Sequence, residues 1–269
     1  MITSTSNDRV KRVVAYGQKS KARREDGVFI IEGMKMLREA PVLQVSEVYV
    51  TEKFVNTASE EDKEILWRYG AETVSEEVMN KMADTQTPQG VLAVIRQYPY
   101  TLEEVLEGYN QSALGKENSP LLLILENIQD PGNLGTMLRS GEGAGVTGII
   151  LSKGSADIYS PKVIRSTMGS IFRMPFIYVE NVPEMVKELN SRGIATYAAH
   201  LKGKKSYDEF DYTRPTAFLI GNEGNGLTKE TADAASEYVL IPMKGEVESM
   251  NAATSAAILT FEASRQRRG

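Results

Sequence analysis

The sequence predicts an α/β protein with two parts. A smaller α/β domain is expected at the N-terminus, and a mostly parallel sheet with helices on both faces is expected at the C-terminus. The chain has 269 residues, enough for one large domain or two modest ones. Helical patterns alternate with short apolar runs that predict buried strands, which is typical of a parallel sheet. In the C-terminal part these runs occupy residues 121–125, 148–151, 195–198, 217–220 and 238–241.

The N-terminal part, residues 1–96, combines helical patterns with short apolar runs. Val10, Val13 and Val14 share one face of a basic helix predicted over residues 7–18. Pro41 ends the helix predicted over residues 32–40. The remaining predicted elements are strands over residues 28–31, 45–50 and 91–95 and helices over residues 59–69 and 75–82.

A linker is expected over residues 97–119, because this stretch is rich in residues that favour turns. One helical pattern lies within it, near residues 101–107. The turn-forming residues are Pro99, Gly108, Asn110, Gly115, Asn118 and Ser119. The sequence therefore predicts an N-terminal domain over residues 1–96 and a C-terminal domain over residues 120–269.

Composition excludes several classes of protein. Hydrophobic residues make up 41% and charged residues 25% of the chain, which is ordinary for a soluble globular protein. The absence of cysteine excludes disulfides, thiolate metal ligands and cysteine nucleophiles. His200 is the only histidine, so no metal site is expected and a structural role is favoured for it. Since no apolar signal segment or membrane-length run exists, a cytoplasmic protein is expected.

The charge distribution is uneven, although the net charge is −5. Residues 1–24 contain only one acid, Asp8, among seven basic side chains. Those seven are Arg9, Lys11, Arg12, Lys19, Lys21, Arg23 and Arg24, and Arg265, Arg267 and Arg268 lie near the other end. A local basic patch on an acidic protein is compatible with RNA contact. The alternative is a solvated helix face, and charge alone leaves both possibilities open.

Polar side chains follow the strand predicted at residues 121–125. Asn127, Asp130 and Asn133 gather at its carboxyl end, where open α/β sheets bind ligands. Asp130 begins a turn with Pro131 and Gly132, and Asn133 is expected to cap the helix that follows. Arg139 falls about two turns into that helix. A plain connection between a strand and a helix is the simpler alternative for any one of these residues.

Two further loops follow predicted strands. The sequence GNEGNG at residues 221–226 comes directly after the strand at 217–220, and its glycines let the backbone approach a ligand closely. The third loop contains Ile241, Met243, Ser249, Met250 and Asn251 and leads into an apolar helix over residues 252–265. Ser249 or Asn251 is the expected N-cap of that helix.

These three segments, in this order, resemble the three signature motifs of the SpoU (TrmH-type) RNA 2′-O-ribose methyltransferases of the SPOUT superfamily. The resemblance covers about residues 120–269, with Met250 where leucine is more usual. The N-terminal region is similar to the RNA substrate-binding domain of such enzymes, chiefly at Phe29-Ile30-Ile31-Glu32-Gly33.

The resemblance implies a deep C-terminal trefoil knot that binds S-adenosylmethionine, and a homodimer that completes each active site. It places seven residues around the cofactor: Leu219, Gly221, Asn222, Gly224, Ile241, Met243 and Met250. The glycines are suited to backbone contact, and the isoleucine and methionines to apolar walls for an adenine.

The implied reaction methylates a ribose 2′-hydroxyl, and the family gives Arg139 the central role. Because arginine stays protonated near neutral pH, holding a phosphate is favoured over removing a proton. Glu223 is the alternative proton acceptor, and Asn133, Ser249 and Asn251 are expected to orient groups. Arg165 and Ser166 also resemble a family segment near the RNA, the alternative being an exposed helix end.

The implied substrate is ribosomal RNA of the 23S type, because a separate N-terminal domain favours it over tRNA. A tRNA methyltransferase and a non-catalytic RNA-binding scaffold of the same fold are the alternatives. A nicotinamide dehydrogenase is disfavoured, since the glycines at residues 141–146 have the wrong spacing and end a helix.

Overall fold

The computed structural model describes residues 1–108, 119–247 and 249–268. Within them the chain forms two compact units. Unit 1 contains Met1–Tyr98 and Asp157–Phe172, and unit 2 contains Pro99–Ala156 and Arg173–Gly269. Residues 157–172, predicted to lie in the C-terminal domain, are thus part of unit 1. None of the described helices is long and apolar enough to cross a membrane.

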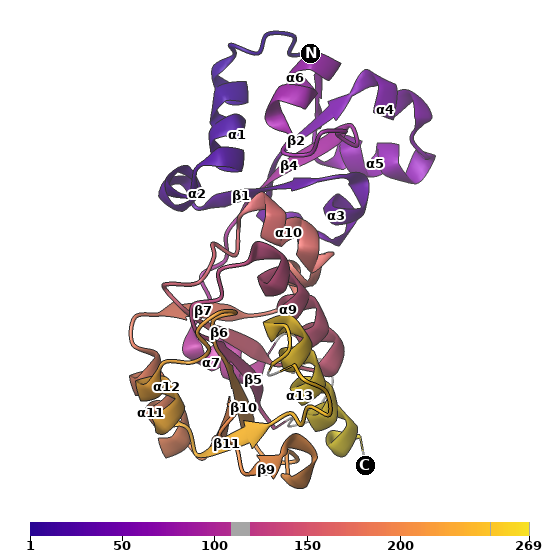
Figure 1. Cartoon of the computed structure of the whole chain (residues 1–269). Coiled ribbons are helices and arrows are strands. Elements are labelled where there is room, and N and C mark those ends of the chain that lie inside the picture. The colour runs from indigo at the N-terminus through magenta and orange to yellow at the C-terminus, as the bar shows by residue number, and fades with distance from the viewer. Residues whose placement is uncertain (109–118, 248, 269) are drawn as a thin grey trace. The chain divides into compact units, whose positions relative to one another are not determined.

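Unit 1 is a four-stranded sheet flanked by helices (Figure 1). Its elements are α1 (Asp8–Gln18), α2 (Ser20–Asp26), β1 (Val28–Glu32), α3 (Met34–Glu39), η1 (Val42–Gln44), β2 (Val45–Thr51), α4 (Glu52–Thr57), α5 (Glu60–Arg68), β3 (Glu72–Val74), α6 (Glu76–Met82), β4 (Val91–Arg96), α10 (Pro161–Thr167) and η2 (Ser170–Phe172). The strand order is β1-β4-β2-β3, with only the β2–β3 pair parallel. Every strand and helix predicted in residues 1–96 is present, and α2, α4 and β3 were not predicted.

Two apolar layers stabilise unit 1. The valines predicted on one face of the first helix lie over β1 and β4, and Val10 and Val13 are fully buried. On the segment from residues 157–172, Tyr159 stacks on Phe29 of β1 with ring centroids 4.8 Å apart. Burial of such side chains stabilises a fold by about 2 kcal/mol each, which explains why this distant segment belongs to unit 1.

Unit 2 is a seven-stranded sheet whose neighbouring strands are all parallel. Its elements are α7 (Leu102–Glu107), β5 (Leu121–Leu125), α9 (Pro131–Ala144), β6 (Gly148–Ser152), β7 (Phe176–Val179), α11 (Val182–Ser191), β8 (Ala195–Ala199), β9 (Lys205–Ser206), η3 (Tyr207–Glu209), β10 (Thr216–Ile220), α12 (Lys229–Ala234), β11 (Glu237–Leu240) and α13 (Ala252–Arg267). The predicted α/β class and parallel sheet are confirmed. The short strands β7 and β9 were not predicted. Most of the predicted linker, residues 109–118, lies outside the described residues.

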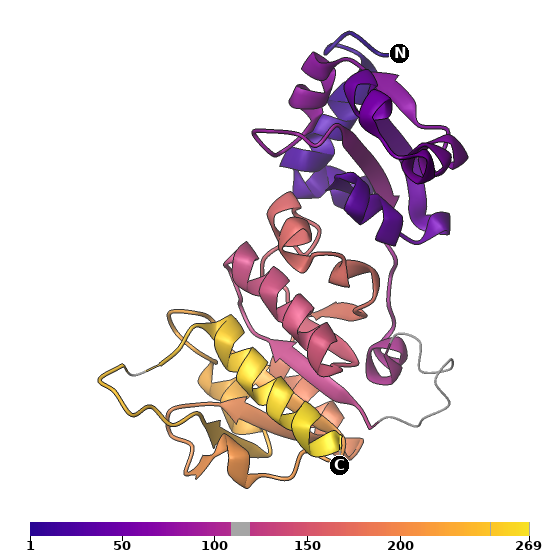
Figure 2. The ribbon, with the colours of Figure 1, turned by 90° about the vertical axis from the view of Figure 1, so that its right-hand side faces the viewer.

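Helices cover both faces of this sheet. On one face α7, α11 and α12 pack on side chains such as Leu122 and Ile124 of β5. On the other face α9 and α13 lie side by side, as Figures 1 and 2 show. The strand order is β7-β6-β5-β10-β8-β11-β9, so the chain leaves β5 and β10 toward opposite edges of the sheet. Loops that follow two such strands diverge, and the space between them is where open parallel sheets bind ligands.

Candidate active site

The first two motif loops leave from neighbouring strands. β5 and β10 pair in parallel, and the amide of Glu126 continues the ladder by donating to the carbonyl of Ile220 at 2.9 Å. The helix α9 then begins at Pro131, and its N-cap is Asp130, which accepts from the amide of Asn133 at 2.7 Å. The expectation that Asn133 caps this helix was wrong. Asp130 supplies the cap, which leaves the Asn133 side chain available for other contacts.

A chain of hydrogen bonds joins the three motif loops. Asn133 Nδ2 donates to Glu223 of the second loop at 3.0 Å, and Asn251 Nδ2 of the third loop donates to Asn133 Oδ1 at 2.9 Å. Asn251 is also the N-cap of α13, as the sequence predicts, because its Oδ1 accepts from the amides of Ala253 and Thr254. Residues that are about 90 and 118 positions apart in the chain therefore meet at one point.

Glu223 is held as a carboxylate. Partial burial opposes its ionisation, but the hydrogen bonds from Asn133 Nδ2 and from backbone amides, including those of Asp130 and Gln129, lower its pKa below the usual 4.5. A carboxylate stabilised by several donors binds a proton weakly. The arrangement therefore suits Glu223 to fixing the two loops against each other better than to accepting a proton.

A cavity of about 340 Å³ opens beside this network. Its volume is in the range of small-molecule sites. Eight of the predicted site residues line it: Gly221, Asn222, Glu223, Gly224, Ile241, Met243, Ser249 and Met250. Glu248 of the third motif lies outside the described residues. The second and third loops thus form one cavity, together with the end of β8, the strand that lies between β10 and β11 in the sheet.

Gly221 is required by the geometry of the second loop. Asn222 and Gly226 pair through two backbone hydrogen bonds of 3.0 and 2.9 Å, which folds the loop back onto Gly221. A Cβ atom on Gly221 would lie 2.1 Å from the backbone of Gly226 and Leu227. No side chain fits at that distance, so only glycine lets the loop close here.

Besides Asn133 and Asn251 of the hydrogen-bonded chain, two predicted site residues do not line the cavity. Leu219 is fully buried in the core, and its neighbour Ile220 is the residue of β10 that reaches the cavity. Arg139 is exposed on α9, and within the described part of the chain it forms no hydrogen bond or ion pair. Its guanidinium is therefore free to contact a group from outside this chain.

The segment at the end of β8 and the side chain of Glu126 also contribute to the site, and neither was predicted from the sequence. The cavity is also lined at the end of β8 by Ala199, His200 and Leu201. Because ligands bind at the carboxyl ends of parallel strands, the position of these residues after a predicted strand could have indicated them as site residues. Glu126 is buried and accepts from the amide and hydroxyl of Thr228 at 2.7 and 3.0 Å and from the hydroxyl of Thr231. It fixes the end of the second loop, and no pattern in the sequence distinguishes it from a solvated acid.

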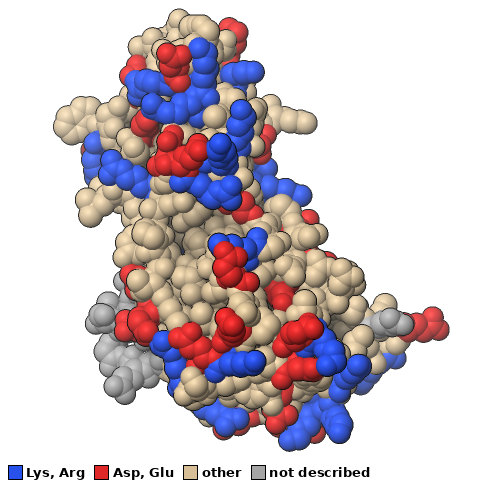
Figure 3. All heavy atoms as spheres, turned by 90° about the vertical axis from the view of Figure 1, so that its left-hand side faces the viewer, with Lys and Arg blue, Asp and Glu red and all other residues tan. Residues whose placement is uncertain are grey.

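The predicted RNA-binding side chains of unit 1 are largely paired with acids. Arg12 lies 2.6 Å from Glu47, Arg9 bonds Glu72 at 3.3 Å, and Lys11 and Arg165 pair with Asp8 and Asp84 at 2.9 and 2.5 Å. Basic and acidic side chains are accordingly intermixed on the face that carries α1 and α2 (Figure 3). Arg24 is exposed and has no acidic partner among the described residues.

Arg23 corrects the sequence analysis. It is only 4% exposed, and it donates to the carbonyl of Tyr16 and to Asp157 at 2.6 Å each. A guanidinium buried in this way does not reach a phosphate. Its role is to attach α2 to the segment 157–172 within unit 1.

The fold and the site together define a class of protein, a parallel α/β unit with a cofactor-sized cavity at the carboxyl ends of β8, β10 and β11. A model of the SpoU rRNA Methylase family matches residues 120–261, and a model of an MRM3-like substrate binding domain matches residues 7–93. The chain belongs to the SpoU rRNA methylase family.

Three similar proteins match this chain over nearly their whole length. The 23S rRNA (guanosine(2553)-2′-O)-methyltransferase RlmP of Bacillus subtilis is 30% identical over 260 residues, which is 97% of each chain. An AdoMet-bound rRNA methyltransferase from Sinorhizobium meliloti superposes with a TM-score of 0.83 at 30% identity and covers 98% of this chain and 97% of its own. The SpoU methyltransferase AviRb from Streptomyces viridochromogenes in complex with AdoMet gives 0.84 at 26% identity, over 98% and 99%.

Proposed function

We propose that this protein methylates the 2′-hydroxyl of a ribose in RNA with S-adenosylmethionine as the methyl donor. The observation that carries the proposal is the hydrogen-bonded chain Glu223–Asn133–Asn251, which joins all three motif loops beside one cavity. Relatives that match nearly the whole chain are named as rRNA methyltransferases, and two of the structural neighbours hold AdoMet.

The residues that line the cavity fit the cofactor. Backbone groups of Gly221 and Gly224 are accessible, and Ile241, Met243 and Met250 offer apolar surface to an adenine ring. Asn222 is constrained, because it donates to the carbonyl of Asn127 and accepts from the amide of Gly224, each at 2.9 Å. When bound, S-adenosylmethionine supplies an electrophilic methyl group.

We assign positioning roles to Asn133, Glu223 and Asn251 and a substrate-binding role to Arg139. The lowered pKa of Glu223 disfavours it as the general base. The free guanidinium of Arg139 is suited to a phosphate oxygen and so to placing the 2′-hydroxyl. Ser249 lines the cavity and is exposed, so it is a further candidate to contact the ribose.

We propose ribosomal RNA of the 23S type as the substrate, in the cytoplasm, in preference to tRNA. Unit 1 matches a substrate-binding domain, and RlmP acts on 23S rRNA by its name. In this proposal residues 1–96 bind the RNA, residues 97–119 link the domains and residues 120–269 carry catalysis. The exposed Arg24 and the ion-paired Arg9, Lys11, Arg12 and Arg165 are then RNA contacts of unit 1.

We also propose the trefoil knot and the homodimer of the family. The third loop meets the first at Asn133, and the terminal helix α13 packs on α9, as a knotted chain end requires. On the same surface Phe261 of α13 is 46% exposed beside Gly143, and Arg139 lies one turn before Gly143 on α9. We propose this surface, which carries both Phe261 and Arg139, as the face that meets a second copy of the chain.

Methyl transfer to RNA tests the proposal. Purified protein is expected to bind S-adenosylmethionine and to transfer a labelled methyl group to 23S rRNA more than to tRNA. Arg139→Ala is expected to retain cofactor binding and to lose transfer by at least 100-fold, on the order of a lost positioning group. Cofactor binding without transfer by the unaltered protein would favour the non-catalytic scaffold, and no binding at millimolar cofactor would exclude the proposal.

Mixing two inactive proteins tests the dimer. If each active site is completed by the other subunit, an Arg139→Ala variant and a Gly221→Ala variant recover activity when their subunits exchange, because half of the sites in a mixed dimer are intact. Sedimentation establishes the oligomeric state. A monomer with full activity would contradict the shared site.

A further inference from the structure

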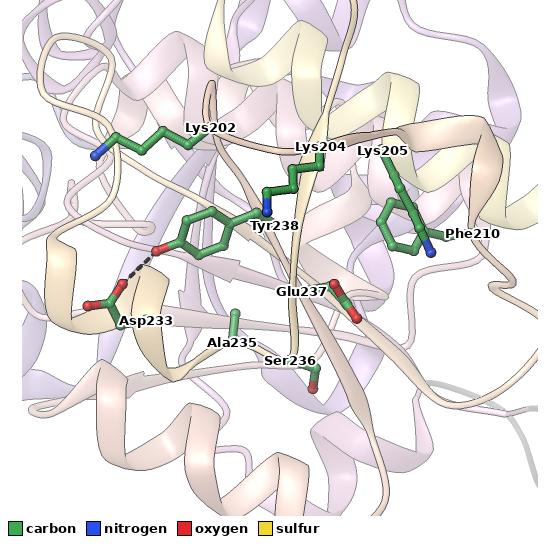
Figure 4. Close-up of a pocket in the computed structure, with 9 residues that line it drawn as sticks. All are labelled: Lys202, Lys204, Lys205, Phe210, Asp233, Ala235, Ser236, Glu237 and Tyr238. Atoms are coloured by element: carbon green, nitrogen blue, oxygen red, sulfur yellow. Dashed lines mark hydrogen bonds between the residues drawn. The ribbon is translucent and has the colours of Figure 1, made fainter.

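A second cavity, of about 500 Å³, lies at the β9–β11 edge of the sheet in unit 2. Figure 4 shows three lysines above it, Lys202, Lys204 and Lys205, with Tyr238 between the first two and Phe210 beside the third. Asp233, Ala235, Ser236 and Glu237 complete the lining. None of the three motif loops contributes to this cavity.

The three lysines bring positive charge that is not neutralised locally. Within the described residues none of them forms an ion pair, whereas Asp233 is already paired with Lys229 at 2.7 Å and accepts from the Tyr238 hydroxyl at 2.6 Å. Glu237, the other lining acid, forms no ion pair among those residues and interacts electrostatically with Arg214. The surroundings of the cavity therefore favour an anion.

Aromatic side chains connect this cavity to the candidate active site. Tyr238 stacks on His200 with ring centroids 4.8 Å apart, and His200 lines the cavity of the active site. The Nδ1 atom of His200 accepts from the amide of Lys202 at 3.0 Å, which fixes the first lysine relative to this ring pair. Lys205 Nζ lies 5.5 Å from the centroid of the Phe210 ring. The two cavities thus share the His200–Tyr238 pair as a common wall.

We infer that Lys202, Lys204 and Lys205 form a subsite for RNA backbone phosphates next to the nucleotide to be methylated. RNA binding depends on lysine and arginine at phosphates, yet most of the basic side chains of α1 are paired with acids such as Glu47. In unit 2 the three lysines meet that requirement, and the half-buried rings of Tyr238 and Phe210 beside them suit single-stranded nucleotides. The inference rests on the proposed function, because it assumes an RNA substrate.

Neutralising the three lysines together tests the subsite. In the variant Lys202→Gln/Lys204→Gln/Lys205→Gln, KM for RNA is expected to rise roughly tenfold or more, and the slope of log affinity against log salt to fall by about 2, at about 0.7 per lost phosphate contact on a single strand. Affinity for S-adenosylmethionine serves as the check on folding, because the lysines do not line that cavity.

Two matched variants complete the experiment. The triple Lys→Arg variant at the same positions keeps the charge and is expected to restore the salt slope. Lys187→Gln removes one exposed lysine of α11 that lines neither cavity and is expected to leave KM near that of the unaltered protein.

The outcomes separate the two proposals. If the unaltered protein transfers no methyl group to RNA, the proposed function fails. If it transfers methyl and the Lys→Gln triple variant keeps the same KM and salt slope, the subsite inference is overturned. Inorganic phosphate is the third probe, and the chemical shifts of the lysine Nζ groups report its binding. If these shifts respond to millimolar phosphate while the triple variant keeps its RNA affinity, the cavity binds a free anion and the RNA inference is overturned.

Discussion

Asn251 Nδ2 donates a hydrogen bond to Asn133 Oδ1 at 2.9 Å, across 118 positions of sequence. The Oδ1 atom of the same Asn251 caps α13, so one side chain joins the start of the terminal helix to the start of α9. Asn133 in turn donates to Glu223, which makes it the central member of the chain. The alignment of the three loops therefore depends on the side-chain amide of Asn133, whose Nδ2 atom donates and whose Oδ1 atom accepts.

The substitution Asn133→Asp is expected to lower stability and cofactor affinity more than Asn133→Ala does. Asn133→Ala removes two hydrogen bonds and is expected to destabilise the protein by about 1–3 kcal/mol. Asn133→Asp places a second carboxylate where Glu223 now accepts at 3.0 Å, and like charges at that distance repel. Cofactor affinity and thermal unfolding measure both effects.

The double variant Asn133→Asp/Glu223→Gln is the matched control. It exchanges donor and acceptor between the two positions, while the acceptor for Asn251 is retained. We expect it to recover part of the stability that Asn133→Asp alone loses, because the nitrogen introduced by Glu223→Gln cannot also accept from the Asp130 amide, which Glu223 Oε1 now does at 3.2 Å. If the double variant loses as much stability as the two single variants together, the hydrogen bond does not couple these residues.

The lowered pKa of Glu223 predicts a pH dependence of stability. Partial burial opposes ionisation, but the bonds from Asn133 and from backbone amides outweigh it, so the pKa lies below the usual 4.5. A carboxyl with a lowered pKa in the folded state contributes stability that is complete above its unfolded value and is lost as pH falls through the folded value.

The difference in unfolding free energy between the unaltered protein and Glu223→Gln, followed from pH 7 down to pH 3, isolates this contribution. Glu262, whose pKa is lowered by its hydrogen bond from Arg265, is present in both proteins and cancels. We expect a difference that is constant above about pH 5 and shrinks below pH 4.5. A difference that grows on acidification would contradict the assignment.

Gly221→Ala is expected to weaken cofactor binding. The added Cβ would lie 2.1 Å from the backbone of Gly226 and Leu227, so the second loop has to open. Overpacking of this kind costs about 1–3 kcal/mol, and we expect cofactor affinity to fall at least tenfold. Gly245→Ala in the third loop is the control, because nothing lies within 4 Å of its added Cβ. Calorimetric titration with S-adenosylmethionine compares the two.

Sequence patterns predict the strands and the loops of unit 2 well, because apolar runs such as 121–125 are fully buried on both faces of a parallel sheet. They also place each motif loop directly after a strand, and the family resemblance adds that the second and third loops share one cofactor site. They do not locate residues 157–172, whose contact with Phe29 depends on packing between distant segments.

Charge patterns are the weakest guide, as Arg23 and Arg12 illustrate. The count of basic residues in 1–24 is correct, yet Asp157 and Glu47, the partners that neutralise these two arginines, lie far along the chain. The pairing of Asn133 with Asn251 is likewise invisible locally, because each residue alone fits an ordinary helix start. Tertiary contacts thus decide which polar residues belong to the site.

Arg267 is expected to be the basic residue near the C-terminus on which stability depends. Its guanidinium donates to the carbonyls of Ser119 at 2.5 Å, Pro120 at 3.0 Å, and Tyr212 and Arg214 at 2.8 Å each, and burial lowers its pKa. These bonds join the end of α13 to the segments that precede β5 and β10. Arg267→Gln loses most of them and is expected to destabilise the fold by about 2–4 kcal/mol.

The neighbouring Arg268 is exposed, so Arg268→Gln is the matched control, with an expected change within about 0.5 kcal/mol in chemical unfolding. Equal effects of the two substitutions would mean that general charge near the C-terminus, and not the carbonyl contacts of Arg267, stabilises α13.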